Sequence, residues 1–288
     1  MLPRFDSSRH VVDVGPAELA VLDVGTGDGV LFVHGVFMSS QLWAPTLAVL
    51  PGGRRYIAVD LPVHGHSPAA NDAATSIPGC AELIDPLLDC LGVDRVHLVG
   101  NDSGGAIVQR FAVAHLDRVA SVSLTNCDTE GNIPPAAFET VVELARAGAL
   151  GNVLELMRTD MTFARSSQGL GGSLQHPETL ADDDILAFLD PFVSSSNATA
   201  QFQRFVGSFC PADLEGVTDS LAELQLSTLL AWGTRDVFFG PKWGRAFARA
   251  LGASATLVEI PGGKLFWPME RPAELSALLV PHWDSAPS

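Results

Sequence analysis

The most informative segment of the chain reads Val96-His97-Leu98-Val99-Gly100-Asn101-Asp102-Ser103-Gly104-Gly105, an apolar run that leads into a glycine-rich turn. A strand-to-helix turn that presents a nucleophile needs small residues two positions before it and two or three positions after it, because the backbone passes very closely. Gly100, Gly104 and Gly105 satisfy this rule if Asp102 is the presented residue. Presenting Ser103 instead would place Asn101 at the crowded position. We therefore predict a nucleophile elbow that carries the carboxyl group of Asp102.

A phosphate-binding turn is the alternative interpretation of this segment. Backbone N–H groups at the start of a helix hold phosphate in nucleotide-binding folds. The segment has neither the G-x-G-x-x-G spacing nor the lysine of a P-loop. The turn is therefore not expected to bind a nucleotide.

Eight short, apolar runs typical of strands alternate with helical segments. This alternation predicts an α/β fold with a mostly parallel eight-stranded sheet and helices on both faces. The expected strands are 10–14, 18–24, 30–34, 56–60, 96–100, 120–125, 228–233 and 256–260, and the expected helices include 81–91, 104–115 and 243–251.

The alternation stops between the sixth and seventh runs. Residues 134–224 are helical and loop-like, so we predict an inserted helical cap there, with the core formed by residues 1–133 and 225–288. Within the cap, Phe202, Phe205 and Phe209 form one helical stripe. Such a stripe most often packs one part of a protein onto another. A cap over the strand ends would also roof an apolar pocket for a small molecule.

Length, charge and cysteine content limit the class of protein. The 288 residues, 47% hydrophobic, suffice for one large core. Lys+Arg 17 against Asp+Glu 33 gives a net charge of −16, which disfavours nucleic acid and anionic membrane surfaces as partners. A neutral or cationic small-molecule substrate is easier to accommodate. Neither a secretory signal nor a membrane-spanning run is apparent, so we expect a cytoplasmic protein.

The four cysteines indicate reduced thiols rather than a metal site. They form no C-x-x-C pair and no zinc-type spacing with histidine, and we expect no metal and no cofactor. The sequence sets no oligomeric state. These cysteines are Cys80, Cys90, Cys127 and Cys210.

Three further motifs surround the elbow in the pattern of a known family. They are His34-Gly35-Val36-Phe37, Asp60-Leu61-Pro62-Val63-His64-Gly65-His66-Ser67 and Gly233-Thr234-Arg235-Asp236. Together with the elbow they resemble the α/β-hydrolases over nearly the whole chain, closest to the branch of haloalkane dehalogenases and epoxide hydrolases. Val63 departs from the glycine that is common at its position.

The resemblance implies roles for several residues. The backbone N–H groups of Val36 and Ser103 would form the oxyanion hole, and Asp236 would stand at the position of the triad acid. Donors of an oxyanion hole typically contribute about 3 to 4 kcal/mol to a transition state. We also expect Phe37 and Phe266 to line the substrate pocket.

The catalytic histidine of the family is missing. The segment Glu259-Ile260-Pro261-Gly262-Gly263-Lys264-Leu265-Phe266-Trp267 aligns with the place where the family carries it, and Leu265 occupies the position. In an Asp-nucleophile hydrolase that imidazole activates the water that releases the covalent ester. Leucine accepts no proton, so ordinary hydrolysis is doubtful. His176, in the cap, is the one histidine whose loop we consider able to reach the pocket.

Further departures argue against two familiar reactions. Ser103 and Val36 stand where the resemblance to dehalogenases would call for a halide-binding Trp and commonly an Asn. The epoxide hydrolases would call for tyrosines in the cap, but the single tyrosine, Tyr56, belongs to a core strand.

These residues predict an atypical enzyme of the α/β-hydrolase fold. Burial disfavours the charged form of a carboxyl group, so Asp102 is a candidate general acid or base as well as a nucleophile. Asp236 either repels Asp102 or shares a proton with it, or is neutralised by Arg235 or Lys264. We predict lyase, isomerase or cyclase chemistry on a small, mainly apolar organic molecule.

Two alternatives stay open. One is a hydrolase of an ester, epoxide or haloalkane that uses a substitute base. The other is a catalytically silent small-molecule-binding protein.

Overall fold

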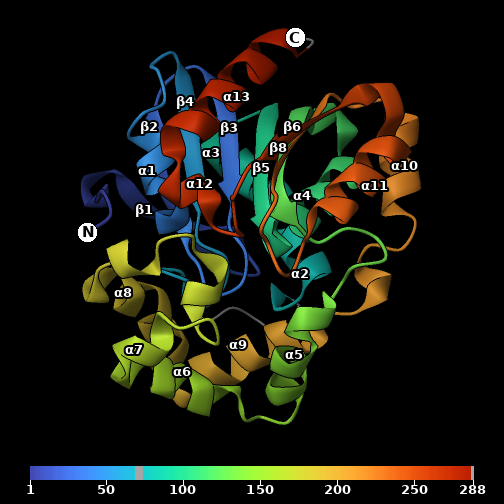
Figure 1. Cartoon of the computed structure of the whole chain (residues 1–288). Helices are drawn as coiled ribbons and strands as arrows, with labels where there is room; N and C mark the ends of the chain where they lie inside the picture. Colours follow the sequence, from blue (N-terminus) through green and yellow to red (C-terminus); the bar gives the residue numbers. More distant parts are fainter. Residues whose placement is uncertain (69–73, 287–288) are drawn as a thin grey trace.

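One sheet of eight strands forms the centre of the part of the chain that the computed structural model describes, residues 1–68 and 74–286 (Figure 1). The strand order is β1-β2-β4-β3-β5-β6-β7-β8. β1 and β2 pair antiparallel with their neighbours, and all pairs from β4 to β8 are parallel. The predicted α/β-hydrolase fold with a mostly parallel sheet is confirmed. The strands are β1 (Arg9–Asp13), β2 (Glu18–Gly25), β3 (Asp28–Val33), β4 (Arg54–Val59), β5 (Val96–Asp102), β6 (Val119–Cys127), β7 (Thr228–Gly233) and β8 (Ala255–Ile260).

The central strands are apolar because helices cover both of their faces. Every residue of β5 and of β7 is buried, as expected for a parallel sheet inside an α/β fold. β5 and β6 both continue beyond the predicted ends, because Asn101 pairs with Thr125 and Asp102 with Cys127. Polar residues thus extend the ladder at the carboxyl ends of these strands.

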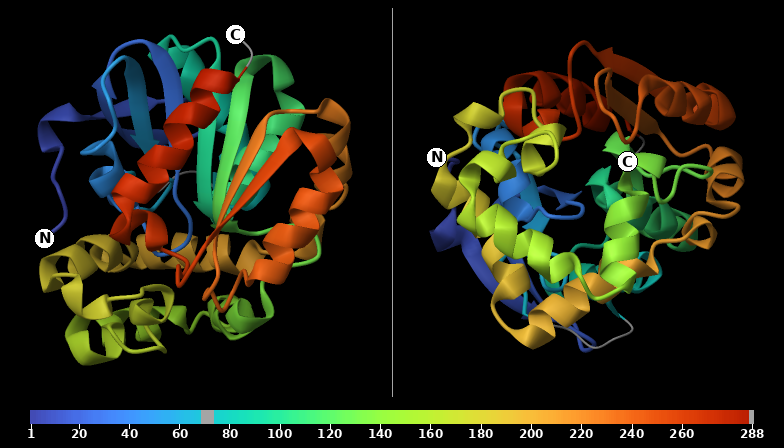
Figure 2. Two further views of the ribbon diagram at one scale, coloured as in Figure 1. Left: turned by 45° about the horizontal axis from the view of Figure 1, so that its top comes forward. Right: turned by 60° about the horizontal axis from the view of Figure 1, so that its bottom comes forward.

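Helices pack on each face of the sheet, as Figures 1 and 2 show. On one face α4 contacts β5 and β6, and on the other α13 contacts β6 and β7. Among the described residues no helix has both the length and the apolar character needed to cross a membrane. The helices are α1 (Ala44–Leu47), α2 (Ile77–Glu82), α3 (Ile84–Leu91), α4 (Ser103–Ala114), α5 (Glu139–Arg146), α6 (Leu150–Thr159), α7 (Met161–Ala164), α8 (Asp182–Val193), α9 (Ser196–Ser208), α10 (Val217–Leu224), α11 (Pro241–Leu251), α12 (Trp267–Glu270) and α13 (Pro272–Ser285).

The single helix predicted over 81–91 is two helices, α2 and α3. Pro86 has no N–H to donate to the carbonyl of Glu82, so a continuous helix would lose a hydrogen bond at this point. The Ser76 hydroxyl caps α2 by accepting a hydrogen bond from the Gly79 N–H at 3.0 Å. The prediction of one continuous helix was therefore wrong, although both segments are helical.

Helices α5 to α9 lie together below the carboxyl ends of the strands, between β6 and β7 in the chain (Figure 1). Within this group α5 packs on α9, and α8 packs on α6 and α9. α10 also falls within the predicted cap range 134–224, but it packs against α4 and α11 of the core.

Aromatic side chains join the cap to the core. The ring of His64, from the loop after β4, lies 5.0 Å from Phe192 and 5.5 Å from both Phe202 and Phe205, measured between ring centroids. Phe37 lies 5.4 Å from Phe202. Two members of the predicted phenylalanine stripe therefore serve as packing residues.

Candidate active site

Asp102 occupies a tight turn between β5 and α4. Its backbone angles are φ 56° and ψ −134°, a conformation that non-glycine residues rarely adopt. A Cβ atom added to Gly104 would lie 2.4 Å from the Val33 carbonyl oxygen, and one added to Gly105 would lie 2.2 Å from Cys127 Cβ. The turn therefore requires glycine at these positions, which is the steric rule that the sequence suggested.

The loop after β3 passes directly beside the Asp102 carboxyl group. A Cβ atom on Gly35 would lie 2.5 Å from Asp102 Oδ2. The backbone N–H groups of Val36 and Ser103 donate toward the same carboxyl group. The two donors proposed from the resemblance are thus brought together, and both lower the pKa of the Asp102 carboxyl group.

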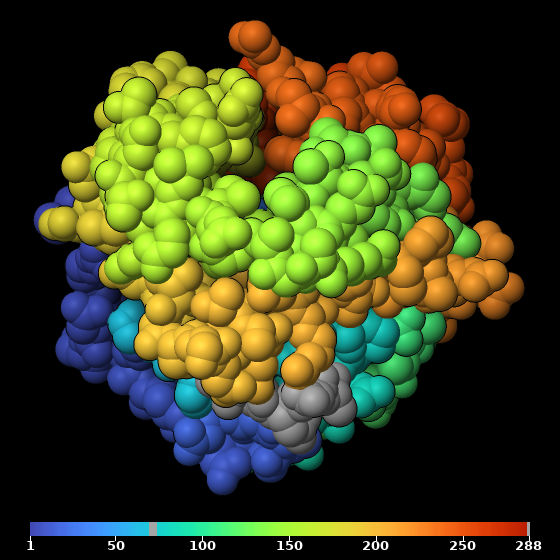
Figure 3. All heavy atoms as spheres, turned by 90° about the horizontal axis from the view of Figure 1, so that it is seen from below, coloured from blue at the N-terminus to red at the C-terminus, as the bar shows by residue number. Residues whose placement is uncertain are grey.

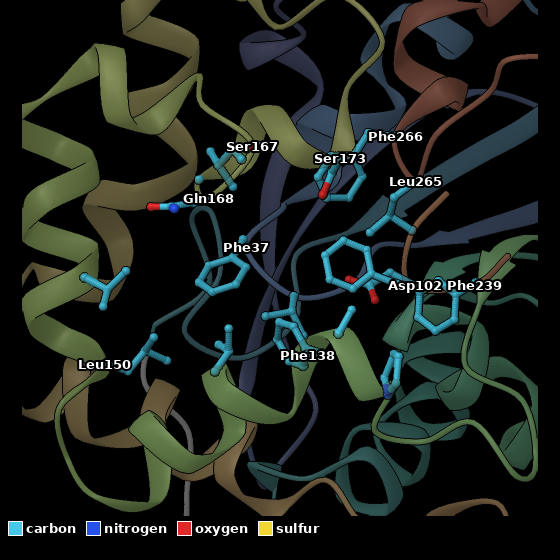
Figure 4. Close-up of a pocket in the computed structure, with 18 of the residues that line it drawn as sticks. Phe37, Asp102, Phe138, Leu150, Ser167, Gln168, Ser173, Phe239, Leu265 and Phe266 are labelled. Carbon is cyan, nitrogen blue, oxygen red and sulfur yellow. The ribbon is translucent and has the colours of Figure 1, made fainter. Parts of the chain in front are cut away.

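A cavity of about 320 Å³ lies in front of Asp102, between the core and the cap. Figure 4 shows Asp102 and Leu265 on one side and Leu150 and Gln168 of the cap on the other. Seen from below, the surface is hollowed between cap segments and a C-terminal segment (Figure 3). The walls are mainly apolar, and they include Val36, Phe37, Phe138, Leu144, Leu150, Val153, Met157, Leu170, Phe209, Phe238, Phe239, Leu265 and Phe266.

Asp236 follows β7 but does not line this cavity. Its Oδ1 accepts a hydrogen bond from the Phe238 N–H at 2.8 Å. Asn126 holds the surrounding loop, since its amide donates to the carbonyls of Gly233 (3.1 Å) and Phe239 (3.3 Å). Asp236 is therefore fixed by the backbone of the loop that carries Phe238 and Phe239, and its charge raises the pKa of Asp102.

Burial is the main influence on both acids. It raises the pKa of Asp102 to about 8, with a further increase from the charge of Asp236 and an opposing effect of the Val36 and Ser103 N–H groups. Burial raises the pKa of Asp236 to about 6, opposed by hydrogen bonds from its neighbours and by the charge of Lys264. In residues 1–68 and 74–286 no ion pair joins Asp236 to Arg235 or Lys264. The charge of Asp236 thus raises the pKa of Asp102, while the charge of Lys264 lowers the pKa of Asp236.

Asp128 is a third acid at the site, and the sequence analysis missed it. It directly follows β6, lines the cavity and is 1% exposed. Neither of its carboxyl oxygens has a hydrogen-bond partner in another residue. Burial, followed by the charges of Asp102 and Asp213, raises its pKa well above the ordinary value. Its position at the carboxyl end of a parallel strand was the available signal.

All eight histidines lie within the described residues, and none of them lines the cavity. His176 is 64% exposed, with its Nδ1 3.4 Å from Glu178 Oε1, and it borders a separate depression together with Arg235 and Lys264. The structure therefore does not place His176 in the pocket where the sequence analysis had put it. At the expected position of the catalytic imidazole, the Leu265 side chain faces the cavity.

The buried histidines beside the site are structural. His34 Nε2 accepts a hydrogen bond from the Leu61 N–H at 3.0 Å. Burial lowers the pKa of His34 to about 4 and that of His64 to about 3. Both rings are therefore neutral near pH 7. The described residues also contain no group of three His, Cys, Asp or Glu side chains arranged to hold a metal ion.

Comparison with known proteins agrees with this architecture. Residues 30–278 match the family described as "Alpha/beta hydrolase family". The chain is 36% identical over 245 residues to RutD of Variovorax paradoxus, which is named for carbamate hydrolysis, with 80% of this chain and 90% of RutD covered. It is 26% identical over 282 residues to haloalkane dehalogenase 2 of Mycobacterium bovis, covering 96% of this chain and 92% of that enzyme.

A solved structure supports the same fold. Haloalkane dehalogenase DbeA from Bradyrhizobium elkani matches with a TM-score of 0.78 at 20% identity, covering 96% of this chain and 97% of DbeA. The chain thus belongs to the alpha/beta hydrolase family, with a pattern like that of its dehalogenase and epoxide hydrolase branch.

Proposed function

We propose that this protein is an enzyme that acts on a small, mainly apolar organic molecule, with the Asp102 carboxyl as the reacting group. One observation carries the proposal. The carboxyl faces an apolar cavity of about 320 Å³ in which Leu265 takes the place expected for an imidazole. The relatives support a small-molecule substrate, since their names refer to carbamates and haloalkanes.

The protonation state of Asp102 favours acid/base chemistry. A pKa of about 8 keeps the carboxyl mostly protonated at pH 7. A protonated carboxyl donates a proton, whereas nucleophilic attack needs the carboxylate. Asp102 is therefore better suited near neutral pH to protonate the substrate than to attack it.

A reaction that needs no activated water fits this arrangement best. Hydrolysis of an ester formed on Asp102 would need a water molecule that a base deprotonates, and Leu265 cannot act as that base. By contrast, Asp102 can give a proton to one substrate atom and take a proton from another, which restores the carboxyl in each turnover. Isomerisation, elimination and cyclisation can each regenerate the protonated carboxyl of Asp102 without water. We therefore assign the protein to the lyase, isomerase or cyclase type.

Hydrolysis with Asp128 as the base is the second candidate. Asp128 lines the same cavity, and the named relatives are hydrolases. In this mechanism ionised Asp128 takes a proton from the water molecule that attacks the substrate. Incorporation of oxygen from ¹⁸O-labelled water separates the two candidates.

The test compares the unmodified chain with Asp102→Asn and Leu265→His. Each is incubated with a panel of esters, epoxides, haloalkanes, enones and polyenes in ¹⁸O water, and products and intact protein mass are recorded. We expect products without ¹⁸O and without a protein adduct. Loss of general acid/base catalysis should lower kcat of Asp102→Asn by about 10²- to 10⁴-fold.

Other outcomes would contradict the proposal. Full activity of Asp102→Asn on the same substrate would remove Asp102 from the reaction. A stable adduct on Asp102 would identify a nucleophile instead of an acid. Ligands that bind tightly and return unchanged would favour a silent binding protein.

One outcome with Leu265→His would support the proposal. If this variant hydrolyses esters and the unmodified chain does not, the missing imidazole is the reason for a non-hydrolytic reaction.

A further inference from the structure

The side chain of Asp128 has no hydrogen-bond donor in any other residue, although its own backbone N–H acts on the carboxyl group. It is 1% exposed, lines the Asp102 cavity, and neither carboxyl oxygen has a hydrogen-bond partner in another residue. Buried polar groups are nearly always hydrogen-bonded, and an unsatisfied one costs about 1–3 kcal/mol. Its backbone carbonyl, by contrast, accepts a hydrogen bond from Gln109 Nε2 at 2.8 Å. The residue is held firmly, and its carboxyl group at the cavity wall keeps both oxygens without a donor from another residue.

The charged side chains that act directly on Asp128 are all acids. Asp102 on β5, Asp213 before α10 and Asp236 after β7 all act on it, and the Cys127 thiol is its neighbour in the chain. None of the described residues that line the cavity is lysine, arginine or histidine. The net charge of −16 adds an attraction for cations over the whole molecule. The missing partner is therefore a positively charged hydrogen-bond donor.

We infer that the molecule bound in this cavity is an amine, whose ammonium group is received by Asp128 while its apolar body lies against the phenylalanine and leucine walls. This inference rests on the proposed function in one respect, namely that the cavity holds the substrate. Two or three N–H donors of one ammonium group can satisfy both oxygens of Asp128 and offset the repulsion among the acids. A buried charge becomes acceptable when it is paired in this way.

Other ligands fit the cavity less well. A hard metal ion needs about six oxygen ligands, and the apolar walls do not supply them. A neutral molecule with a carbonyl group would accept one hydrogen bond from protonated Asp128 and would leave the second carboxyl oxygen without a donor. The ammonium–carboxylate pair also adds no net charge beside Asp102, so the acid role proposed for Asp102 is retained.

Calorimetric titration of the full chain with two matched probes tests the inference. The probes are 3-phenylpropylamine and 3-phenylpropanol, which have nearly the same size and apolar body and differ in charge. The amine, with a pKa of about 10 like that of lysine, remains a cation from pH 6 to 8. We expect the amine to bind at least about tenfold tighter than the alcohol at pH 8, a difference of about 1.4 kcal/mol. Its affinity should rise from pH 6 to 8, because binding displaces a proton from a carboxyl whose pKa is raised.

Two variants of equal net charge locate the effect. Asp128→Asn should bring the affinities of amine and alcohol to within about threefold of each other. Binding of the alcohol by this variant shows that the cavity is intact. Asp183→Asn, on the exposed surface at the start of α8, removes the same charge and should retain the preference for the amine.

Several results would overturn the inference. One is equal affinity for amine and alcohol in the unmodified chain, and another is a preference for the amine that survives in Asp128→Asn. A third is an affinity for the alcohol that increases as the pH falls, together with an affinity for the amine that does not increase from pH 6 to 8. If Asp128→Asn does not fold, proton release by the unmodified chain decides the question. That release is measured by titrating the amine in two buffers of different ionisation enthalpy, and its absence counts against Asp128. None of these readouts depends on turnover by Asp102, so failure here is distinguishable from failure of the proposed function.

Discussion

At the scale of the residue, burial sets the charge of the acids around the cavity. The native state holds a proton on Asp102 up to about pH 8, whereas the unfolded chain releases it near 3.8, the ordinary pKa of an aspartate. Between these values the native state binds more protons than the unfolded state. Stability therefore falls as pH rises through this window, by up to about 1.4 kcal/mol per pH unit for each such group. The cost supports a functional role for the acids, because ordinary core residues would avoid it.

Replacing Asp102 by asparagine should therefore stabilise the fold in a pH-dependent way. Asparagine keeps the shape and an acceptor for the Val36 and Ser103 N–H groups, but it carries no charge. We expect the gain in the free energy of unfolding to increase from pH 5 to 8 by about 1 kcal/mol per pH unit. Urea unfolding at pH 5, 6.5 and 8 measures it. Asp183→Asn serves as the exposed control, and a gain that is the same at all three pH values would contradict the raised pKa of Asp102.

At the scale of the element, two loops determine where the Asp102 carboxyl points. The turn between β5 and α4 forces a positive φ on Asp102, and the loop after β3 supplies Gly35 and Val36 from the other side. Two other non-glycine residues of the motifs also have positive φ, Phe37 with 63° and Val63 with 69°. Val63 is the departure from glycine noted in the sequence, so the chain retains the left-handed geometry without the residue that adopts it most easily.

Gly35→Ala should disrupt the site through a steric clash. The new Cβ would lie 2.5 Å from Asp102 Oδ2, so either the loop or the carboxyl must move. We expect a loss of about 1–3 kcal/mol in stability, typical of overpacking, together with loss of turnover. Gly52→Ala is the matched control, because nothing lies within 4 Å of its added Cβ, and it should change stability by less than about 0.5 kcal/mol. Thermal unfolding and turnover of both variants provide the test, and normal turnover by Gly35→Ala would contradict the assigned geometry.

At the scale of the whole molecule, the joint between cap and core contains a buried histidine. His64 Nδ1 donates a hydrogen bond to the Pro62 carbonyl oxygen at 2.9 Å, and the ring packs against rings of α8 and α9. Burial lowers its pKa to about 3, with a further decrease from His34. The unfolded chain therefore binds more protons than the native state between about pH 6.5 and 3. This contribution to stability is lost as the pH falls, opposite in sign to that of Asp102.

His64→Gln should make the protein less sensitive to acid. Glutamine does not titrate, so the stability lost between pH 7 and 5 should shrink by about 2 kcal/mol relative to the unmodified chain. Loss of ring packing lowers stability equally at both pH values and cancels in this comparison. The exposed His10→Gln is the control and should leave the difference as it is. Urea unfolding at pH 7 and 5 gives the result, and an unchanged difference in His64→Gln would show that His64 does not cause the acid sensitivity.

The amino-acid sequence by itself determined the features that depend on neighbours along the chain. Alternating apolar runs predicted the sheet, and the glycines around Asp102 predicted the tight turn, because hydrophobic periodicity and steric exclusion act over a few residues. The alignment of motifs also placed Leu265 at the position of the missing imidazole, and the structure brings its side chain to the cavity.

Only the tertiary structure decided which polar groups share the cavity. It brought in Asp128, left His176 at the surface, kept Asp236 out of the cavity lining and packed α10 against α4 and α11. The physical reason is that burial and electrostatic repulsion are sums over residues far apart in the sequence. Asp102 ends one strand, and Asp128 and Asp236 follow two others. Their pKa values are raised only because folding removes them from water and brings them together.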